Sequence, residues 1–125
     1  MAVHLNHTIV LCKDSKRSAR FLADLLGRSP PTRFGPFQVV TLDNDVSLDF
    51  YESDKPIRSQ HYAFPIDEET FDAAFARMGA QGVTYWADPG KTKANQINRN
   101  DGGRGMYFED LDGHWLEVIT RPYGG

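Results

Sequence analysis

The stretch Gly105–Thr120, GMYFEDLDGHWLEVIT, decides the fold. Apolar residues recur on both sides of the pair Asp112–Gly113, and an Asp-Gly pair between two such runs is a strong hairpin signal. The stretch therefore predicts two antiparallel strands. Successive side chains of a strand point to opposite faces, so Glu117 lies on the face opposite Leu116 and Val118. The last strand thus carries one carboxylate on the side away from its apolar residues.

The rest of the chain predicts the element order β-α-β-β-β, followed by the same order again. Asp14 and Asp67 are typical N-caps of two helices, and Gly27 and Gly82 are typical C-terminal stops. The predicted strands span residues 5–11, 37–42, 46–51, 60–66, 83–86, 105–110 and 114–120. Residues 29–36 contain three prolines, which favours a loop or an irregular edge strand.

The polar stretch Glu52–Arg58 is the best linker between the two halves. We therefore predict a single α+β domain, residues 1–125, that consists of two tandem βαβββ modules. Module 1 covers about residues 4–55 and module 2 about residues 57–121.

The two halves place the same kinds of side chain at matching positions. His7 aligns with His61 at an offset of 54 residues, and the two C-terminal hairpins align Asp49 with Glu117 at an offset of 68. The 14 extra residues of the second half fit within a long polar loop, Asp88–Gly105. Each half thus has a histidine on its first strand and a carboxylate on its last, both opposite the apolar face. Imidazole nitrogens and carboxylate oxygens are common ligands of divalent transition metals.

Composition excludes several classes of protein. The 125 residues carry 14 Lys and Arg against 17 Asp and Glu, so the formal net charge is −3, which argues against a sequence-independent nucleic-acid binder. No apolar run approaches about 20 residues, so we expect no membrane-spanning helix. Residues 1–6 lack the pattern of a signal peptide, so we expect none. The single cysteine, Cys12, excludes a disulfide within the chain, and a reducing cytoplasm is the expected location.

Four segments resemble the vicinal oxygen chelate superfamily, which includes glyoxalase I, extradiol dioxygenases, fosfomycin-modifying thiol transferases, methylmalonyl-CoA epimerase and bleomycin-binding proteins. They are LNHTIVL (5–11), DSKRSARFLADLLG (14–27), QHYAFPI (60–66) and the hairpin 105–120. The resemblance implies paired modules whose mixed and antiparallel strands form a cup around a divalent metal ion, which is Zn, Ni, Mn, Fe or Co. The family's usual ligands map onto His7, His61 and Glu117.

The resemblance leaves the role of Asp49 open. Glyoxalase I-like proteins often have Glu at this position, whereas dioxygenases and thiol transferases usually lack a carboxylate there. Asp is one methylene shorter than Glu, so Asp49 ligates the metal directly, acts through water or supports the ligands. Glu117 or Asp49 is the expected general base.

The expected activity is that of a metal-dependent enzyme with glyoxalase-like lyase or isomerase chemistry. Its substrate would be a small oxygenated molecule, anionic or conjugated to a thiol. A fosfomycin-type thiol transferase and a non-catalytic antibiotic-binding resistance protein are the alternatives, and oxygen chemistry with iron stays open.

The loop Asp88–Gly105 is expected to border the metal site. Arg99 and Arg104 are the candidates for binding an anionic group of the substrate, and the alternative is a solvated loop. Trp86 and Trp115 are expected to line the substrate site, with core packing as the alternative. Asn98–Gly103, NRNDGG, is similar to a polar loop of the fosfomycin thiol transferases.

We expect the protein to bind a small-molecule substrate, without nucleic-acid or membrane partners, and to form a homodimer. The family precedent implies two composite sites. In each, His7 and Asp49 of one chain would meet His61 and Glu117 of the other.

Overall fold

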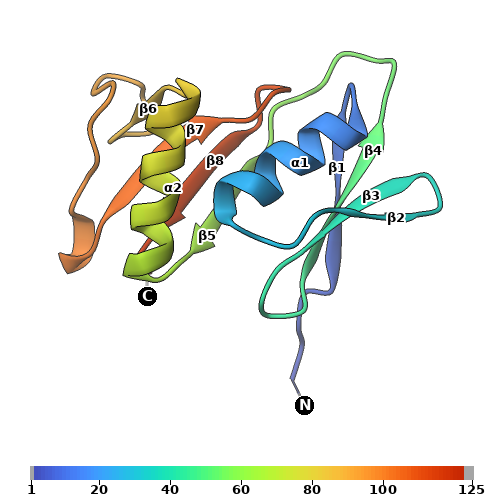
Figure 1. Ribbon diagram of the computed structural model, residues 1–125, viewed down its shortest axis with the longest axis horizontal. Helices are drawn as coiled ribbons and strands as arrows, with labels where there is room; N and C mark the ends of the chain where they lie inside the picture. Colours follow the sequence, from blue (N-terminus) through green and yellow to red (C-terminus); the bar gives the residue numbers. More distant parts are fainter. Residues whose placement is uncertain (1, 123–125) are drawn as a thin grey trace. The chain divides into compact units, whose positions relative to one another are not determined.

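The computed structural model describes residues 2–122 and contains two compact units, Met1–Ile57 (unit 1) and Arg58–Gly125 (unit 2). Each unit has the order β-α-β-β-β, so the predicted α+β repeat is confirmed (Figure 1). Unit 1 contains β1 (His7–Cys12), α1 (Ser15–Leu26), β2 (Thr32–Phe34), β3 (Phe37–Thr41) and β4 (Ser47–Glu52). Unit 2 contains β5 (His61–Pro65), α2 (Glu68–Gln81), β6 (Tyr85–Trp86), the 3-10 helix η1 (Asn100–Gly102), β7 (Gly105–Glu109) and β8 (Trp115–Ile119).

The two sheets have the same strand order and the same register. The orders are β1-β4-β3-β2 and β5-β8-β7-β6, and in each sheet the first strand pairs with the last in parallel. Ile9 lies opposite Asp49 in unit 1, and Ala63 lies opposite Glu117 in unit 2. Ala63 follows Ile9 by 54 residues and Glu117 follows Asp49 by 68, so the registers of the two sheets confirm both predicted offsets.

Both helices begin and end at the predicted residues. The side chain of Asp14 accepts a hydrogen bond from a backbone N–H at the start of α1, and Asp67 does the same for α2. Gly27 and Gly82 end the helices with φ of 67° in each case, a left-handed conformation that favours glycine. Among the described residues, neither helix is long and apolar enough to cross a membrane.

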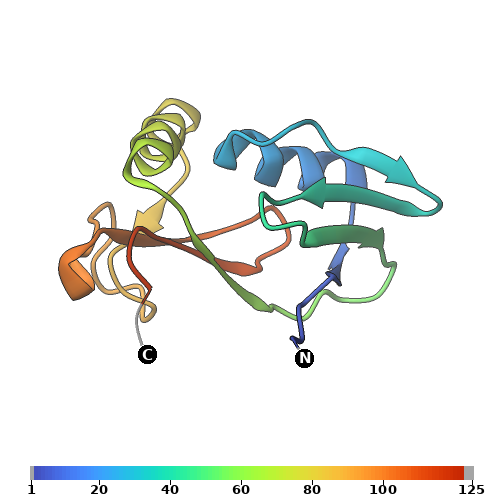
Figure 2. The same ribbon diagram turned by 90° about the horizontal axis from the view of Figure 1, so that it is seen from below.

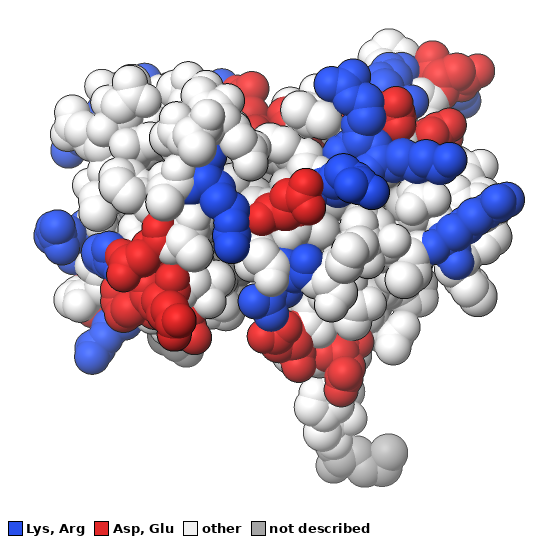
Figure 3. All heavy atoms as spheres, viewed as in Figure 1, with Lys and Arg blue, Asp and Glu red and all other residues white. Residues whose placement is uncertain are grey.

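Each helix covers the apolar face of the sheet of its own unit (Figure 2). The largest side chains that this packing buries completely include Phe50 and Leu25 in unit 1 and Phe71, Met78 and Phe108 in unit 2. Within the described part of the chain, no α-helix covers the other face of either sheet (Figure 2). On unit 1 this open face includes Ile9, whose side chain is 50% exposed. The face drawn in Figure 3 carries both acidic and basic side chains, consistent with the small net charge.

One of the two alternatives predicted for residues 29–36, an irregular edge strand, is confirmed, whereas the loop 88–105 contains more structure than predicted. Residues 29–36 form the short edge strand β2 between their prolines. The loop 88–105 contains η1 and two isolated bridges, one from Trp86 to Ala94 and one from Asn98 to Gly105. A Cβ on Gly105 would lie 2.9 Å from the Asn98 side-chain oxygen, so a larger residue here would force the Asn98 side chain to shift.

Asp110 organises the turn of the last hairpin. Its Oδ1 accepts hydrogen bonds from the backbone N–H groups of Asp112 and His114, both at 2.9 Å. The buried ring of His114 accepts through Nδ1 a hydrogen bond from the backbone N–H of Gln60, 3.0 Å away, which ties the turn to the start of β5. Burial raises the pKa of Asp110 above its ordinary value of 3.8.

We expect Asp110→Ala to lower the free energy of unfolding by about 1–3 kcal/mol, because two backbone N–H groups lose their acceptor. Asp110→Asn keeps an acceptor oxygen and cannot ionise. Since the folded pKa is raised, ionisation of Asp110 reduces stability as the pH rises from 3.8 through that pKa. Urea unfolding at several pH values should show that the asparagine variant gains stability relative to wild type over this range. Asp45→Asn, in an exposed turn, is the control. Equal stability of the alanine and asparagine variants would contradict this account of the turn.

Candidate metal centre

His61 and Glu117 face each other on the open side of unit 2. The His61 Nδ1 lies 2.8 Å from the carbonyl oxygen of Trp115. A carbonyl oxygen only accepts, so Nδ1 carries the proton and donates it. The other ring nitrogen, Nε2, lies 3.2 Å from the Glu117 Oε1. In the neutral imidazole both of these atoms are acceptors, so their proximity requires a proton or a metal ion between them.

Glu117 is only 1% exposed, and a buried carboxylate needs compensation by positive charge or hydrogen bonds. The hydrogen bond from the Nδ1 of a histidine to a backbone carbonyl is a common way to orient a metal-binding ring, since it fixes the tautomer. The local chemistry of His61 and Glu117 therefore fits a divalent metal ion.

The matching position in unit 1 is built from the same kinds of donor. The His7 Nδ1 lies 2.7 Å from the Asn6 side-chain oxygen, which accepts its proton and leaves Nε2 as a donor for a metal. The Asp49 Oδ1 accepts a hydrogen bond of 2.8 Å from the Ser47 hydroxyl. His7 and Asp49 lie on the same face of the sheet, because His7 pairs with Ser47 in the register.

A hollow of about 480 Å³ lies over this face of unit 1. His7 and Asp49 contribute polar atoms to its wall, and Phe34, Phe37 and Val39 contribute apolar ones. The hollow has the mixed lining of a small-molecule site, with a few polar groups among apolar side chains.

Neither unit contains a complete ligand set by itself. Within residues 2–122, no three His, Cys, Asp or Glu side chains come together as a metal-binding group. The structure pairs His7 with Asp49 in unit 1 and His61 with Glu117 in unit 2.

Aromatic side chains occupy the face of unit 2 that carries Glu117. The Tyr107 ring stacks on the Trp115 ring at 5.7 Å between centroids, and the Trp86 ring lies 5.4 Å from that of Trp115. Tyr107 lies opposite Glu117 in the register, and its ring lies 6.3 Å from that of His61. Trp86 and Trp115, both predicted for substrate binding, are thus on the same face as the predicted ligands of this unit.

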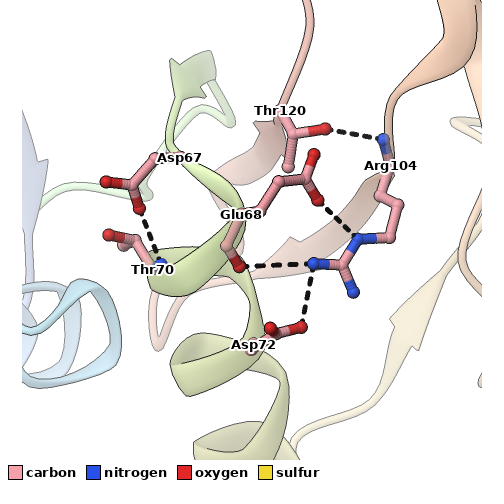
Figure 4. Close-up of polar contacts among 6 residues, drawn as sticks. All are labelled: Asp67, Glu68, Thr70, Asp72, Arg104 and Thr120. Atoms are coloured by element: carbon pink, nitrogen blue, oxygen red, sulfur yellow. Dashed lines mark hydrogen bonds and ion pairs between the residues drawn. The ribbon is translucent and has the colours of Figure 1, made fainter.

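Arg104 lies on the opposite, helix-covered face (Figure 4). Its Nε donates to the Glu68 carboxylate at 2.8 Å, one terminal nitrogen forms an ion pair with Asp72 at 2.8 Å, and its guanidinium lies 4.4 Å from the Phe71 ring centroid. Its backbone N–H donates to the Thr120 hydroxyl. Asp72 first, and Glu68 after it, raise the pKa of Arg104. This guanidinium is engaged with α2, whereas Arg99, at the start of η1, is exposed.

Two charged residues on the Glu117 face, Glu109 and Lys91, are not among the predicted site residues. Glu109 lies opposite Trp115 across the last hairpin, and Lys91 forms an ion pair with it. The alternation of the hairpin contained the signal for Glu109, which is separated from Tyr107 by one residue and shares its face. The position of Lys91 depends on the path of a loop and has no comparable signal.

The chain is similar to one protein family and to several individual proteins. The family model of the Glyoxalase/Bleomycin resistance protein/Dioxygenase superfamily matches residues 4–118. The chain is 32% identical over 124 residues to glutathione transferase FosA from Serratia marcescens, covering 94% of this chain and 81% of FosA. The solved structure of Oxidase ChaP-H1 is 57% identical, with a TM-score of 0.97 over 99% of this chain and 100% of that one. Oxidase ChaP-H2 is 54% identical, with a TM-score of 0.97 over 100% and 98% of the two chains.

We expect Arg104→Gln to destabilise the fold by about 1–2 kcal/mol, because it removes the contact with the Phe71 ring and two partly exposed ion pairs. Hydrogen bonds from Thr120 and Arg104 lower the pKa of Glu68 below 4.5. Their stabilising effect is therefore present above this pH and is lost as the pH falls through the folded pKa. Urea unfolding at pH 7 and pH 4 should show that acidification lowers the free energy of unfolding less in Arg104→Gln than in wild type. Arg99→Gln is the matched control. Equal effects of the two substitutions would refute the stabilising role of the contacts between Arg104 and α2.

Proposed function

We propose, since this chain belongs to the Glyoxalase/Bleomycin resistance protein/Dioxygenase superfamily, that it is a metal-dependent oxidase of a small oxygenated molecule. The observation that carries this proposal is the approach of His61 Nε2 to Glu117 Oε1, 3.2 Å apart, on a ring whose Nδ1 is engaged by the Trp115 carbonyl. The identity of 57% with a protein named as an oxidase supports oxidation in preference to the lyase or isomerase chemistry expected first.

His7, His61 and Glu117 would hold the metal. Two histidines and one carboxylate that leave coordination positions open are the donor set of non-haem iron(II) oxygenases, so we propose iron among the expected metals. A bound iron ion supplies Lewis acidity and a redox partner for dioxygen.

The remaining residues would bind the substrate and move its proton. The Ser47 hydroxyl donates to one oxygen of Asp49, and the other oxygen would accept a proton from a substrate hydroxyl. The apolar wall of Phe34, Phe37 and Val39 would exclude water from the bound substrate. In this assignment Asp49 acts on the substrate as a base and Glu117 serves as a ligand.

Untagged protein, reloaded with iron(II) without oxygen, should bind metal in proportion to the number of intact sites. His61→Ala and His7→Ala should each abolish stoichiometric metal in elemental analysis, because each removes one of three ligands. His4→Ala, which changes a histidine outside the strands, should retain it. If His61→Ala keeps full metal content, the site is assigned wrongly.

Glutathione transfer is the second candidate, favoured by the identity of 32% with FosA. Incubation of metal-loaded protein with glutathione and fosfomycin tests it directly, and a glutathione adduct detected by mass spectrometry would replace the oxidase proposal. The hemithioacetal of glutathione and methylglyoxal tests the glyoxalase reaction in the same way. Under the oxidase proposal, neither substrate is converted.

We also propose that the ligand set is completed between two chains of a homodimer. An equimolar mixture of the His7→Ala and His61→Ala chains tests this after subunit exchange. A heterodimer would contain one doubly altered site and one intact site. Random exchange makes about half of the dimers heterodimers, so about a quarter of all sites should recover metal. No recovery, in a mixture shown by native mass spectrometry to contain heterodimers, would mean that the ligands come from a single chain. A monomer in light scattering would also refute the dimer.

A further inference from the structure

We infer that the open face of unit 2 contains a cation-binding subsite, built from Trp86, Trp115 and Glu109 and filled by the chain's own Lys91. The chemical class of its ligand is an organic ammonium group. The inference goes beyond the proposed oxidase activity, since all four residues belong to unit 2 and none is a proposed metal ligand.

The contacts of Lys91 define the subsite. Its Nζ lies 5.3 Å from the Trp86 ring centroid and 5.0 Å from that of Trp115, both within the range of cation–π attraction. The two indole rings meet at an interplanar angle of 49°, so they form two walls around one cation. The Glu109 carboxylate forms an ion pair with the same ammonium. Two tryptophan faces and a carboxylate are the groups that proteins use to recognise ammonium ligands.

The turn that carries Lys91 is also held by hydrogen bonds that do not involve the Lys91 side chain. Asp88 closes the turn by accepting from the backbone N–H of Thr92 at 3.0 Å and of Lys93 at 2.9 Å, and from the Thr92 hydroxyl at 2.6 Å. The backbone N–H of Ala87 donates to the carbonyl of Lys93 at 3.1 Å, which anchors the turn beside β6. These hydrogen bonds do not use the Lys91 side chain, so under this inference they persist when a ligand displaces it.

The exposure of the ion pair allows exchange. The side chains of Lys91 and Glu109 are 46% and 40% exposed, and the lysine has a flexible four-carbon stem. A ligand ammonium must displace Lys91, so the lysine acts as an intramolecular competitor that lowers the apparent affinity. Removal of the lysine should therefore reveal the affinity of the subsite itself.

The chain offers an unusually direct probe, because Trp86 and Trp115 are its only two tryptophans. Tetramethylammonium chloride is titrated into full-length Lys91→Met protein, with sodium chloride at equal ionic strength as the reference, and tryptophan fluorescence is recorded. We expect a saturable response to tetramethylammonium, with half-saturation about tenfold below that of wild type. Lys93→Met, which removes the same charge from the same turn, should behave as wild type. Adding Glu109→Gln to Lys91→Met should raise the half-saturation about fivefold.

Two results would overturn the inference. One is a response of Lys91→Met to tetramethylammonium that equals its response to sodium. The other is a fall in the thermal midpoint of Lys91→Met by more than about 5 °C relative to Lys93→Met, which would make Lys91 a structural clasp. Wild type provides a further test without a substitution, since concentrated tetramethylammonium must compete with the lysine. A wild-type signal that follows ionic strength alone would also count against the subsite.

Discussion

Parallel pairing of the first strand with the last brings a histidine beside a carboxylate in each unit. In unit 2 the register places Trp115 opposite His61 and Glu117 one step further along the same face. The same hydrogen-bonded ladder that forms the sheet supplies the Trp115 carbonyl, which fixes the proton on the Nδ1 of His61. A slip of one residue would turn Glu117 toward the helix, so the site and the hydrophobic core depend on the same register.

The surroundings of Glu117 strengthen its interaction with His61. The carboxylate is almost fully buried, and aromatic rings border it on the open face. Few water molecules reach such a position, so charges interact there more strongly than at an exposed surface. Glu117 therefore needs a positive partner, and the orientation of His61 offers either a proton or a metal ion in that place.

Most of the fold was predictable from local patterns. Capping by Asp14 and Asp67 and the alternation of the last strand depend only on neighbouring residues, and the structure confirms them. The partners of Arg104 were not predictable, because Glu68 and Asp72 are more than 30 residues away in sequence and meet it only after α2 packs on the sheet. Within each unit the predicted histidine and carboxylate share a face, as the alternation of strand residues requires.

The two units share one strand register but differ in the volume of the side chains on their open faces. Ser47 in unit 1 occupies the position that Trp115 occupies in unit 2, and Val39 corresponds likewise to Tyr107. Thr32, opposite Val39, corresponds to Trp86, opposite Tyr107. Three small side chains on unit 1 thus match three large aromatic ones on unit 2. Small side chains leave room for the hollow beside His7, whereas the aromatic rings fill the equivalent space and provide the walls around Lys91. Both halves thereby carry a histidine and a carboxylate at matching positions, while unit 1 has a hollow beside them and unit 2 has an aromatic surface.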